Sequence, residues 1–211
     1  SYMADVYQGV QAPERDFSRF ALTMTYLPHL FLGPIEPYGS MRSALQNRKI
    51  TWSGVGDGLV RLAWGGFKKL VIADRIAAAV IALQAPEHTG VAFLVLSIFY
   101  AVQIYGDFTG GIDVTIGLAE TMGIKLPENF IRPYFSKNIA EYWRRWHISL
   151  STWFREYVYI PLGGNRCSKG RMLLNLLITW MLTGFWHGAS WNYLLWGLYF
   201  FLLLTAEKLF L

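Results

Sequence analysis

Two histidines, His187 and His147, are the side chains best suited to acid–base chemistry in this chain. His187 lies near the middle of a 35-residue stretch, 172–206, that contains no Asp, Glu, Lys or Arg. Ionisable side chains within apolar segments are costly and usually face a cavity or a pathway. Loss of solvent disfavours a charged imidazole, and a neutral ring is what a general base requires. We therefore interpret His187 as functional; the alternative is a buried histidine that donates one hydrogen bond between helices.

Segment 139–158, which contains His147, has the pattern of an amphipathic helix. At about 100° per residue its large apolar side chains share one arc of about 100°; they are Trp143, Trp146, Leu150, Trp153, Phe154 and Tyr157. The pattern predicts a helix resting on a membrane surface. We expect His147 at the border of the apolar face, where its ring can face a cavity, with Ser151 close enough to share a hydrogen bond. A purely anchoring helix is the alternative.

Metal and disulfide chemistry are not supported. The histidines lack metal-ligand spacing, and no cluster of cysteines or carboxylates joins them, so no metal site is predicted; they are His29, His88, His147 and His187. The single Cys167 excludes an intrachain disulfide.

Two further groups of polar residues could be mistaken for catalytic sites. Asp107 and Asp113 would lie about 120° apart on a helix, so we expect them to cap or bridge helices. Ser149 and Ser151 lie near His147 but lack the Gly-x-Ser-x-Gly turn of many serine hydrolases.

The composition is typical of a membrane protein. Of the 211 residues, 54% are hydrophobic, 17% aromatic and only 16% charged, whereas soluble domains are usually about a quarter charged. A 35-residue helix would be roughly 50 Å long, well beyond a hydrocarbon core of about 30 Å. The stretch therefore has to break, most easily at Gly184, Gly188 or Ser190, and we predict two segments, 171–187 and 191–211, with a turn between them. Gly184 and Gly188 would also let a substrate approach the backbone. A large soluble core is the alternative.

Upstream of the histidines the sequence predicts a second apolar element and several connections. Residues 89–106 are long enough for a span that runs into a glycine-rich stretch. A helix is expected over 59–85, partly in the membrane interface because five charged residues lie within it. Residues 20–35, interrupted by prolines and a glycine, favour a re-entrant or interfacial piece. Residues 1–16 and 37–56 are expected to be loops.

The net charge of +5 is unevenly distributed. Residues 125–171 hold nine cations and three acids, a net charge of +6, so the remaining residues sum to −1. A basic block beside apolar segments indicates the cytoplasmic face. It could also attract an anionic donor such as a coenzyme A thioester or a carrier's phosphopantetheine arm; fixing topology alone is the alternative. Nucleic-acid binding is not expected, because these cations are interleaved with Trp and Tyr.

Two motifs around the histidines resemble the bacterial branch of the membrane-bound O-acyltransferase (MBOAT) family. The run 141–165 contains Trp-His-Ile-Ser-Leu-Ser, and 185–189 reads Phe-Trp-His-Gly-Ala, with the histidines 40 residues apart. Supporting similarity lies in 33–35, 67–74, 107–110, 127–130 and 133–134. The subgroup most similar is that of alginate O-acetyltransferases, with teichoic-acid D-alanyl transfer as a relative. Residues 111–113 depart from the usual pattern, which leaves the subgroup open.

The resemblance implies an all-α, multi-pass membrane protein with interfacial and re-entrant helices around a substrate tunnel. The chain would be a single domain, 1–211, from the central part of a longer protein. His187 matches the family's histidine within the membrane and His147 the second active-site histidine. Acyl transfer from a thioester to a hydroxyl is the implied reaction. We expect six further residues to contact substrate: Trp186, Trp191, Trp146, Trp143, Arg144 and Ser151.

The donor is expected to be a thioester of coenzyme A or of an acyl carrier protein, with no bound cofactor. Expected partners are membrane lipids and an exported polysaccharide or a periplasmic acetylation protein, at the bacterial inner (cytoplasmic) membrane. Three alternatives stay open: transfer of D-alanyl or another acyl group to a different cell-envelope polymer, a transporter whose histidines line a proton or solute path, and a structural scaffold.

Overall fold

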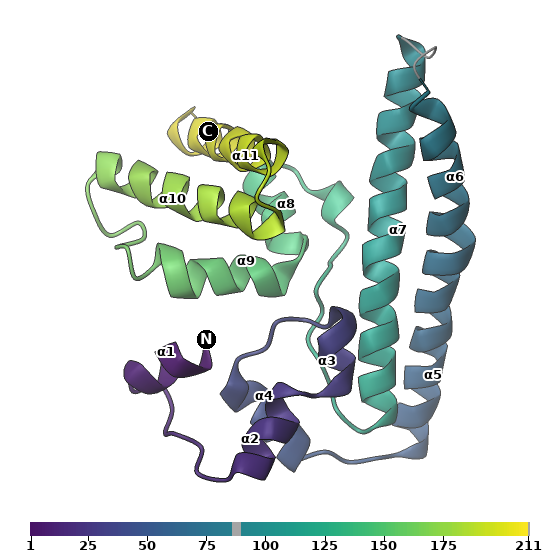
Figure 1. Cartoon of the computed structure of the whole chain (residues 1–211), viewed down its shortest axis with the longest axis vertical. Helices are drawn as coiled ribbons and strands as arrows, with labels where there is room; N and C mark the ends of the chain where they lie inside the picture. Colours follow the sequence, from purple (N-terminus) through teal and green to yellow (C-terminus); the bar gives the residue numbers. More distant parts are fainter. Residues whose placement is uncertain (86–89, 211) are drawn as a thin grey trace. The chain divides into compact units, whose positions relative to one another are not determined.

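The computed structural model describes residues 1–85 and 90–210; His88 lies outside this part of the chain. Every regular element described is a helix, apart from one isolated antiparallel bridge between Phe130 and Trp146. The expectation of an all-α chain is therefore confirmed. The helices form two compact units, Ser1–Pro127 and Glu128–Leu211, and Figure 1 labels them in chain order.

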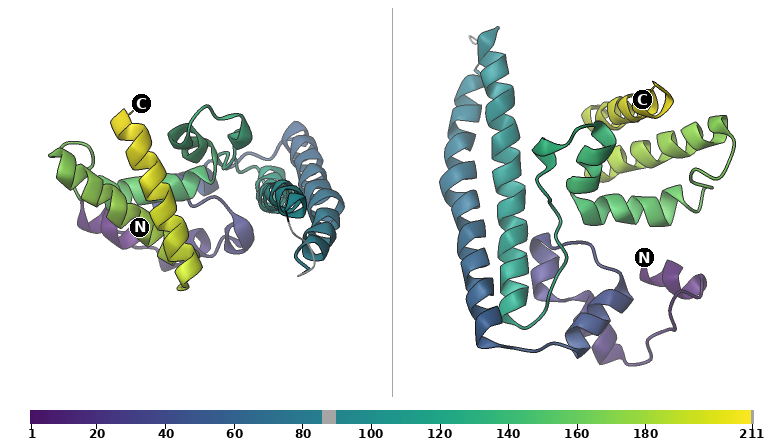
Figure 2. Two further views of the ribbon diagram at one scale, coloured as in Figure 1. Left: turned by 90° about the horizontal axis from the view of Figure 1, so that it is seen from above. Right: turned by 180° about the vertical axis from the view of Figure 1, so that it is seen from behind.

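The longest elements of the first unit lie side by side (Figures 1 and 2). Helix α5 (Trp52–Phe67), a π-helical stretch (Lys68–Ala73) and α6 (Asp74–Leu83) follow without a break and pack along α7 (Val91–Thr121). The helix predicted over 59–85 is confirmed and begins earlier. Of the span predicted over 89–106, residue 89 lies outside the described residues and 91–106 are helical, but α7 continues through the glycine-rich stretch to Thr121.

Glycines explain why that stretch stays helical. A Cβ added at Gly65 of α5 would lie 2.6 Å from the carbonyl oxygen of Gly110 on α7, and one at Gly58 would lie 2.6 Å from that of Gly117. Small residues let two helix backbones approach this closely. The glycines of α7 are therefore a helix-packing surface.

The two aspartates of α7 bridge helices, as the sequence predicted. Asp113 Oδ1 accepts hydrogen bonds from Nε and Nη2 of Arg61 at 3.0 and 2.9 Å, and the same carboxylate pairs with Lys68. Asp107 pairs with Lys69, whose Nζ lies 2.7 Å from Oδ1. Ion pairs thus join α7 to α5 and to the π-helical stretch; the pairs of Asp113 are mostly buried, whereas the pair of Asp107 is about two-fifths exposed. We infer that Asp107 and Asp113 are structural in this unit.

Four short helices precede this hairpin: α1 (Tyr2–Tyr7), α2 (Phe17–Met24), α3 (Leu27–Leu32) and α4 (Tyr38–Gln46). The prediction of loops over 1–16 and 37–56 is therefore wrong where α1, α4 and the start of α5 lie. Residues 20–35 contain two short helices and no single span, as their prolines and glycine predicted. Their depth in a membrane stays a prediction.

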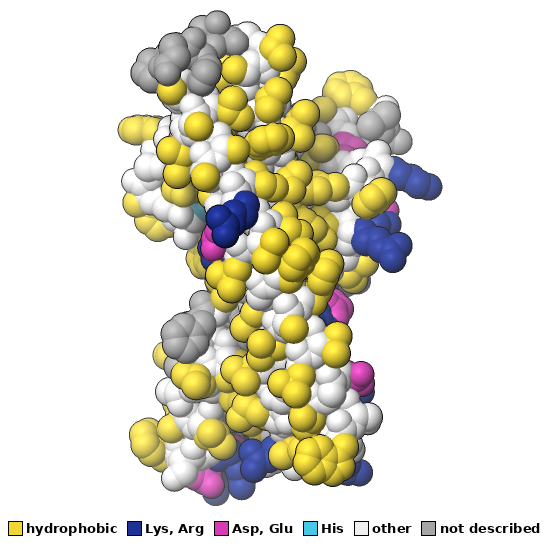
Figure 3. Space-filling model, turned by 90° about the vertical axis from the view of Figure 1, so that its right-hand side faces the viewer, with side chains coloured by type: hydrophobic (Ala, Val, Ile, Leu, Met, Phe, Trp, Pro, Cys, Tyr) yellow, Lys and Arg dark blue, Asp and Glu magenta, His cyan; other side chains and the backbone are white. Residues whose placement is uncertain are grey.

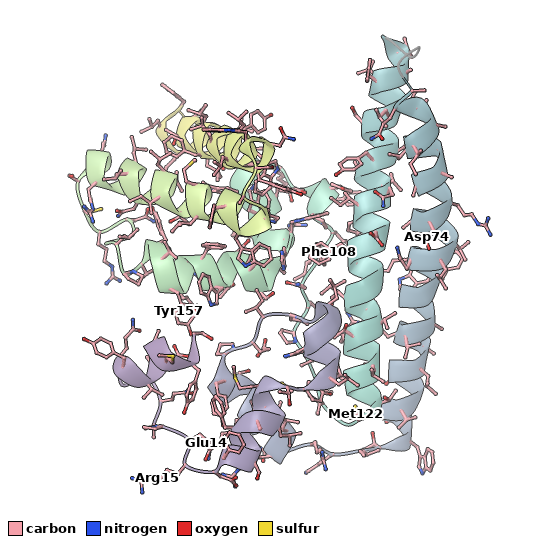
Figure 4. The ribbon with its side chains drawn as sticks, in the orientation of Figure 1. Glu14, Arg15, Asp74, Phe108, Met122 and Tyr157 are labelled. Atoms are coloured by element: carbon pink, nitrogen blue, oxygen red, sulfur yellow. The ribbon has the colours of Figure 1, made fainter. Side chains whose placement is uncertain are left out.

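Contacts to Glu14 explain why polar segments fold here (Figure 4). The Glu14 side chain is only 6% exposed, its carboxylate accepts a hydrogen bond from the Tyr38 hydroxyl at 3.2 Å, and Arg42 pairs with it at the same distance. Its main-chain N–H donates to the Tyr2 hydroxyl at 2.8 Å, and the rings of Tyr2 and Tyr38 meet edge-on, 4.8 Å apart. Tertiary contacts therefore stabilise α1 and α4 although their composition resembles a loop.

The second unit contains the two candidate catalytic histidines. Its elements are a short 3₁₀ turn (Pro133–Phe135), α8 (Ile139–Arg145), α9 (Ile148–Phe154), a π-helical stretch (Arg155–Tyr159), α10 (Lys169–His187) and α11 (Trp191–Phe210). The predicted turn between segments 171–187 and 191–211 is confirmed, because α10 ends at His187 and α11 begins at Trp191. Helices α10 and α11 are neighbours in all views of Figures 1 and 2.

Two helices among the described residues, α7 and α11, are long and apolar enough to cross a membrane. Only 6% of the residues in each apolar window are buried, and Leu94 and Ile98 of α7, for example, are 67% and 63% exposed. Hydrophobic side chains also cover much of the face shown in Figure 3. This exposure favours a lipid environment over the alternative of a large soluble core. The segment predicted over 171–187 is helical but is not among these two candidates.

Candidate active site

Segment 139–158 does not form the single helix that its pattern predicts. Helix α8 ends at Arg145, Trp146 is extended (φ −108°, ψ 126°), and His147 is left-handed (φ 47°, ψ 54°) before α9 begins at Ile148. The prediction of a continuous surface helix is wrong at this point. The position that a helical wheel assigns to His147 is wrong for the same reason.

Hydrogen bonds from an upstream segment replace those of the missing turn. In a continuous helix, Ile148 and Ser149 would donate to carbonyl groups four residues earlier. Instead, the Ile148 N–H donates to the main-chain oxygen of Asn129 at 3.0 Å, and the Ser149 N–H donates to Asn129 Oδ1 at 2.9 Å. The freed carbonyl of Arg145 accepts from the Ile131 N–H at 2.9 Å. The residues that make these replacement hydrogen bonds lie 14 to 20 positions upstream. The helical spacing of apolar residues within 139–158 could not predict them.

The break places the His147 side chain inside the unit. His147 is 7% exposed, its ring stacks on Phe130 with centroids 6.4 Å apart, and the Trp186 ring lies 6.1 Å away. Burial, and secondarily the nearby charge of His187, lower the pKa of the His147 imidazole to about 4. His147 lies outside the two candidate spans. Its ring is therefore neutral near pH 7 and can donate or accept a hydrogen bond.

His187 ends α10, and its ring is oriented by its own helix. Its Nδ1 lies 2.8 Å from the carbonyl oxygen of Thr183, one turn earlier. A carbonyl only accepts, so Nδ1 carries the hydrogen and, in the neutral ring, Nε2 holds the lone pair. The same face of α10 carries hydroxyl bonds from Thr183 to the Thr179 carbonyl and from Thr179 to the Asn175 carbonyl, at 2.8 and 2.7 Å. His187 thus follows a buried polar line along the helix.

Trp186 connects the two histidines. Its ring centroid lies 4.9 Å from that of His187 and 6.1 Å from that of His147, while its own side chain is half exposed. The structure therefore brings His147, His187 and Trp186 together.

Aromatic side chains of α11 complete the surroundings of His187. Trp196 lies 4.8 Å from the His187 ring and Tyr193 lies 6.3 Å from it. The expectation that Gly184 and Gly188 admit a substrate is not what the structure shows. The Cα of Gly197 on α11 lies within 3.5 Å of a Cβ added at Gly184, and the Tyr193 ring covers Gly188. These glycines serve helix packing.

The remaining predicted substrate residues lie in different environments. Trp146 is buried, with its ring 5.0 Å from that of Phe130. Trp143 packs between α10 and α11, its ring 4.9 Å from that of Trp180. The Ser151 N–H donates to the His147 carbonyl at 3.1 Å. The other two are exposed, Arg144 on α8 and Trp191 at the start of α11. A substrate role for these five stays a prediction.

Helical periodicity did not single out Asn129, Phe130, Tyr193 and Trp196 as part of this site. Asn129 and Phe130 belong to the Pro-Glu-Asn-Phe segment, and Trp196 follows the second histidine motif. Their position in or near these motifs was the one feature of the sequence that could have pointed to the site. Among residues 1–85 and 90–210, no group of three His, Cys, Asp or Glu side chains could hold a metal ion.

Outward-facing apolar side chains and two imidazoles that both lie beside Trp186 are typical of a membrane protein, with His147 and His187 as its candidate acid–base residues. The model of the MBOAT, membrane-bound O-acyltransferase family matches residues 16–211. The chain therefore belongs to the membrane-bound O-acyltransferase family. The match includes both histidines and extends over both compact units.

Similar proteins are named for acyl transfer to alginate, peptidoglycan or teichoic acid. The chain is 43% identical over 211 residues to a Pseudomonas syringae pv. tomato protein named "Probable alginate O-acetylase"; the match covers 99% of the chain and 40% of that protein. A Helicobacter pylori "Peptidoglycan O-acetyltransferase" is 37% identical over 91% of the chain and 37% of its own length. A Bacillus subtilis "Teichoic acid D-alanyltransferase" is 30% identical over 96% of the chain and 54% of its own length. The chain thus spans about two fifths to one half of these relatives.

Proposed function

We propose that the protein transfers an acyl group, in the first instance acetyl, from a thioester to a hydroxyl of an exported polysaccharide or of a relay protein. The observation that carries the proposal is the hydrogen bond between His187 Nδ1 and the Thr183 carbonyl. It leaves Nε2 as the basic atom of a ring that lies beside Trp186, and Trp186 also lies beside the His147 ring. The names of the Pseudomonas and Helicobacter relatives support the reaction and the class of acceptor.

In the proposed step, His187 acts as the general base. Its Nε2 accepts the proton of the acceptor hydroxyl as that oxygen attacks the thioester carbonyl carbon, and the carbonyl electron pair moves onto oxygen. Collapse of this intermediate breaks the carbon–sulfur bond. The leaving thiolate takes the proton back from the His187 imidazolium, so an ester and a thiol are the products. Such acid–base assistance contributes roughly 10²–10⁴-fold to a rate.

His147 has a different part in this proposal. Because its pKa is about 4, it is neutral at pH 7 and does not add a second positive charge to the site. A neutral ring can donate a hydrogen bond to the thioester carbonyl oxygen or hold the acceptor hydroxyl. Alignment of the two substrates in a site with little water would supply much of the remaining acceleration.

The donor is proposed to be a thioester of coenzyme A or of an acyl carrier protein, with no bound cofactor. The net charge of +6 over residues 125–171 supports an anionic donor that approaches from the cytoplasmic side. Membrane lipids, the polysaccharide and a periplasmic acetylation protein are the proposed partners. The proposed location is the bacterial inner membrane, with several spans.

Transfer of D-alanyl to a cell-envelope polymer is the second candidate. The observation that favours it is the match to the Bacillus subtilis relative over 96% of the chain. The same pair of histidines would serve either acyl group. Radiolabelled acetyl and D-alanyl donors, supplied to membranes that contain the protein, would distinguish the two reactions by which label enters the polymer.

The decisive experiment compares histidine variants in cells at equal protein levels. His187→Ala should reduce O-acylation of the polymer by about 10²-fold or more, the loss expected for a general base. His29→Ala is the matched control, because His29 is a partly buried histidine on α3, within the first unit, and it should leave the product unchanged. Undiminished product with His187→Ala would reject the proposed function.

A further inference from the structure

We propose that Asn129 is a positioning residue that sets the orientation of His147 through the first two amide groups of α9. The proposal rests on the proposed acyl-transfer function, because it assigns a role to a residue that supports one of the two histidines. Asn129 is fully buried, and two of its oxygen atoms accept hydrogen bonds from the residues that follow His147.

Asn129 supplies the cap that α9 lacks at its own N-terminus. Helices usually begin with Ser, Thr, Asp or Asn, whose side chain accepts a hydrogen bond from the second or third amide of the helix. His147 occupies that position in α9, and its side chain makes no such bond. Asn129 takes over: its main-chain oxygen accepts from Ile148, and its Oδ1 accepts from Ser149. The His147 imidazole therefore does not have to cap α9.

The backbone at His147 shows why this support is needed. His147 is left-handed, with φ of 47°, a conformation that residues other than glycine keep only where the surroundings fix it. The bonds to Asn129 fix the chain after His147, and the bond from Ile131 to the Arg145 carbonyl fixes the chain before it. Phe130, next to Asn129, stacks on the His147 ring with an interplanar angle of 11°. One short segment therefore holds both the backbone and the ring.

The unused atom of Asn129 offers a conservative substitution. Its Nδ2 is buried and has no hydrogen-bond partner among the described residues. Asn129→Asp therefore keeps an oxygen that can accept the hydrogen bond from the Ser149 N–H. It loses only the Nδ2 donor, which bonds no group among the described residues. Asn129→Leu has a similar volume and removes the acceptor.

Asn175 provides a matched control. It is the other fully buried asparagine of this unit, on α10, and it too has one buried atom, Oδ1, without a partner among the described residues. Its Nδ2 bonds the Gly164 carbonyl at 3.4 Å, in the loop before α10 and far along the helix from His187. Asn175→Leu tests what the loss of a buried amide does by itself.

The experiment measures kcat and KM of the complete protein in native membranes, normalised to folded protein. Asn129→Leu should lower kcat by about 30-fold or more, because small misplacement of a catalytic group is costly, with KM for the acceptor changed less than about threefold. Asn175→Leu should leave kcat per folded molecule unchanged. Asn129→Asp should keep kcat within about fivefold of wild type, because its carboxyl oxygen can still accept the hydrogen bond from Ser149.

The outcomes distinguish a failure of the role of Asn129 from a failure of the proposed acyl-transfer function. Wild-type kcat in Asn129→Leu, while His147→Ala is impaired, would overturn the role of Asn129 and leave the proposed function standing. Full activity of both His147→Ala and His187→Ala would overturn the proposed function instead. If Asn129→Leu does not accumulate, the Asp variant decides: a kcat within about fivefold of wild type supports the proposal, and a loss as large as that of His147→Ala overturns it.

Discussion

The Nδ1 atom of His187 lies 2.8 Å from the main-chain carbonyl oxygen of Thr183, one turn earlier on α10. In α10 the carbonyl group of Thr183 thus orients the side chain of the terminal residue, His187. The tautomer of His187 is therefore set by the backbone. No neighbouring carboxylate is required for this orientation.

His187→Asn separates that orientation from the chemistry. The asparagine amide can still donate to the Thr183 carbonyl, but no atom replaces Nε2 as a base. We expect normal protein levels and a loss of acyl transfer of about 10²-fold or more, measured as incorporation of labelled acyl groups in membranes. Retention of more than a tenth of the activity would contradict a role for Nε2 as the base.

Thr183→Val is the matched control for the backbone interaction. The substitution removes the hydroxyl that donates to the Thr179 carbonyl and leaves the Thr183 carbonyl in place. Acyl transfer should stay within about threefold of wild type, because the acceptor of the His187 hydrogen bond is unchanged. A large loss would show that the hydroxyl itself takes part in the site.

His147 should make the protein sensitive to acid. Its pKa in the folded unit is about 4, below the value of about 6.5 for free histidine, so the unfolded chain binds a proton more readily. Its contribution to stability is complete above about pH 6.5 and is lost as the pH falls to 4, by about 3 kcal/mol in total. His147→Asn tolerates the left-handed backbone and has no titratable ring.

Thermal unfolding of the purified protein between pH 4 and pH 8 checks this prediction. The melting temperature of the wild type should fall more steeply with acid than that of His147→Asn, because only the wild type gains a proton at this position on unfolding. Parallel curves for the two proteins would show that another group dominates the acid sensitivity.

Alanine substitution should lower the stability of the protein at Gly65 of α5 but not at the neighbouring Gly66. A Cβ at Gly65 would lie 2.6 Å from the Gly110 oxygen and 2.7 Å from the Val114 nitrogen, whereas one at Gly66 has nothing within 4 Å. Gly65→Ala should destabilise the protein by about 1–3 kcal/mol, because the helices must separate. Gly66→Ala should be neutral or stabilising by up to about 1 kcal/mol. Unfolding temperatures in detergent measure both, and equal shifts would argue against the close α5–α7 contact.

The carboxylate of Asp113 should be important for stability because two cations share it. Arg61 and Lys68 both pair with Asp113, and all three side chains are at least three-quarters buried. Asp113→Asn should destabilise the protein by about 2–3 kcal/mol, less than a fully buried pair because some solvent reaches the site. Asp57→Asn, at an exposed position of α5, is the control and should have no effect. Accumulation in membranes at 37 °C measures the difference, and equal levels for both variants would contradict the prediction.

Much of the fold could be predicted from local patterns. The break near Gly188 follows from the length limit on a spanning helix, and the bridging role of Asp107 and Asp113 follows from their angular separation on α7. Predictions failed where long-range contacts compete with local preference. Glu14 and its partners make helices of segments whose composition resembles loops. Asn129 breaks a segment whose periodicity predicts one helix.

The sequence by itself determined the class of protein, the helical fold and the two histidines, because composition, apolar length and motif spacing are properties of the chain as written. Only the tertiary structure decided how those histidines are presented. His147 is left-handed and buried because Asn129 and Ile131 supply the hydrogen bonds that a continuous helix would have made internally. These hydrogen bonds join residues that are far apart along the chain. The helical spacing of apolar residues reflects only near neighbours, so it could not predict them.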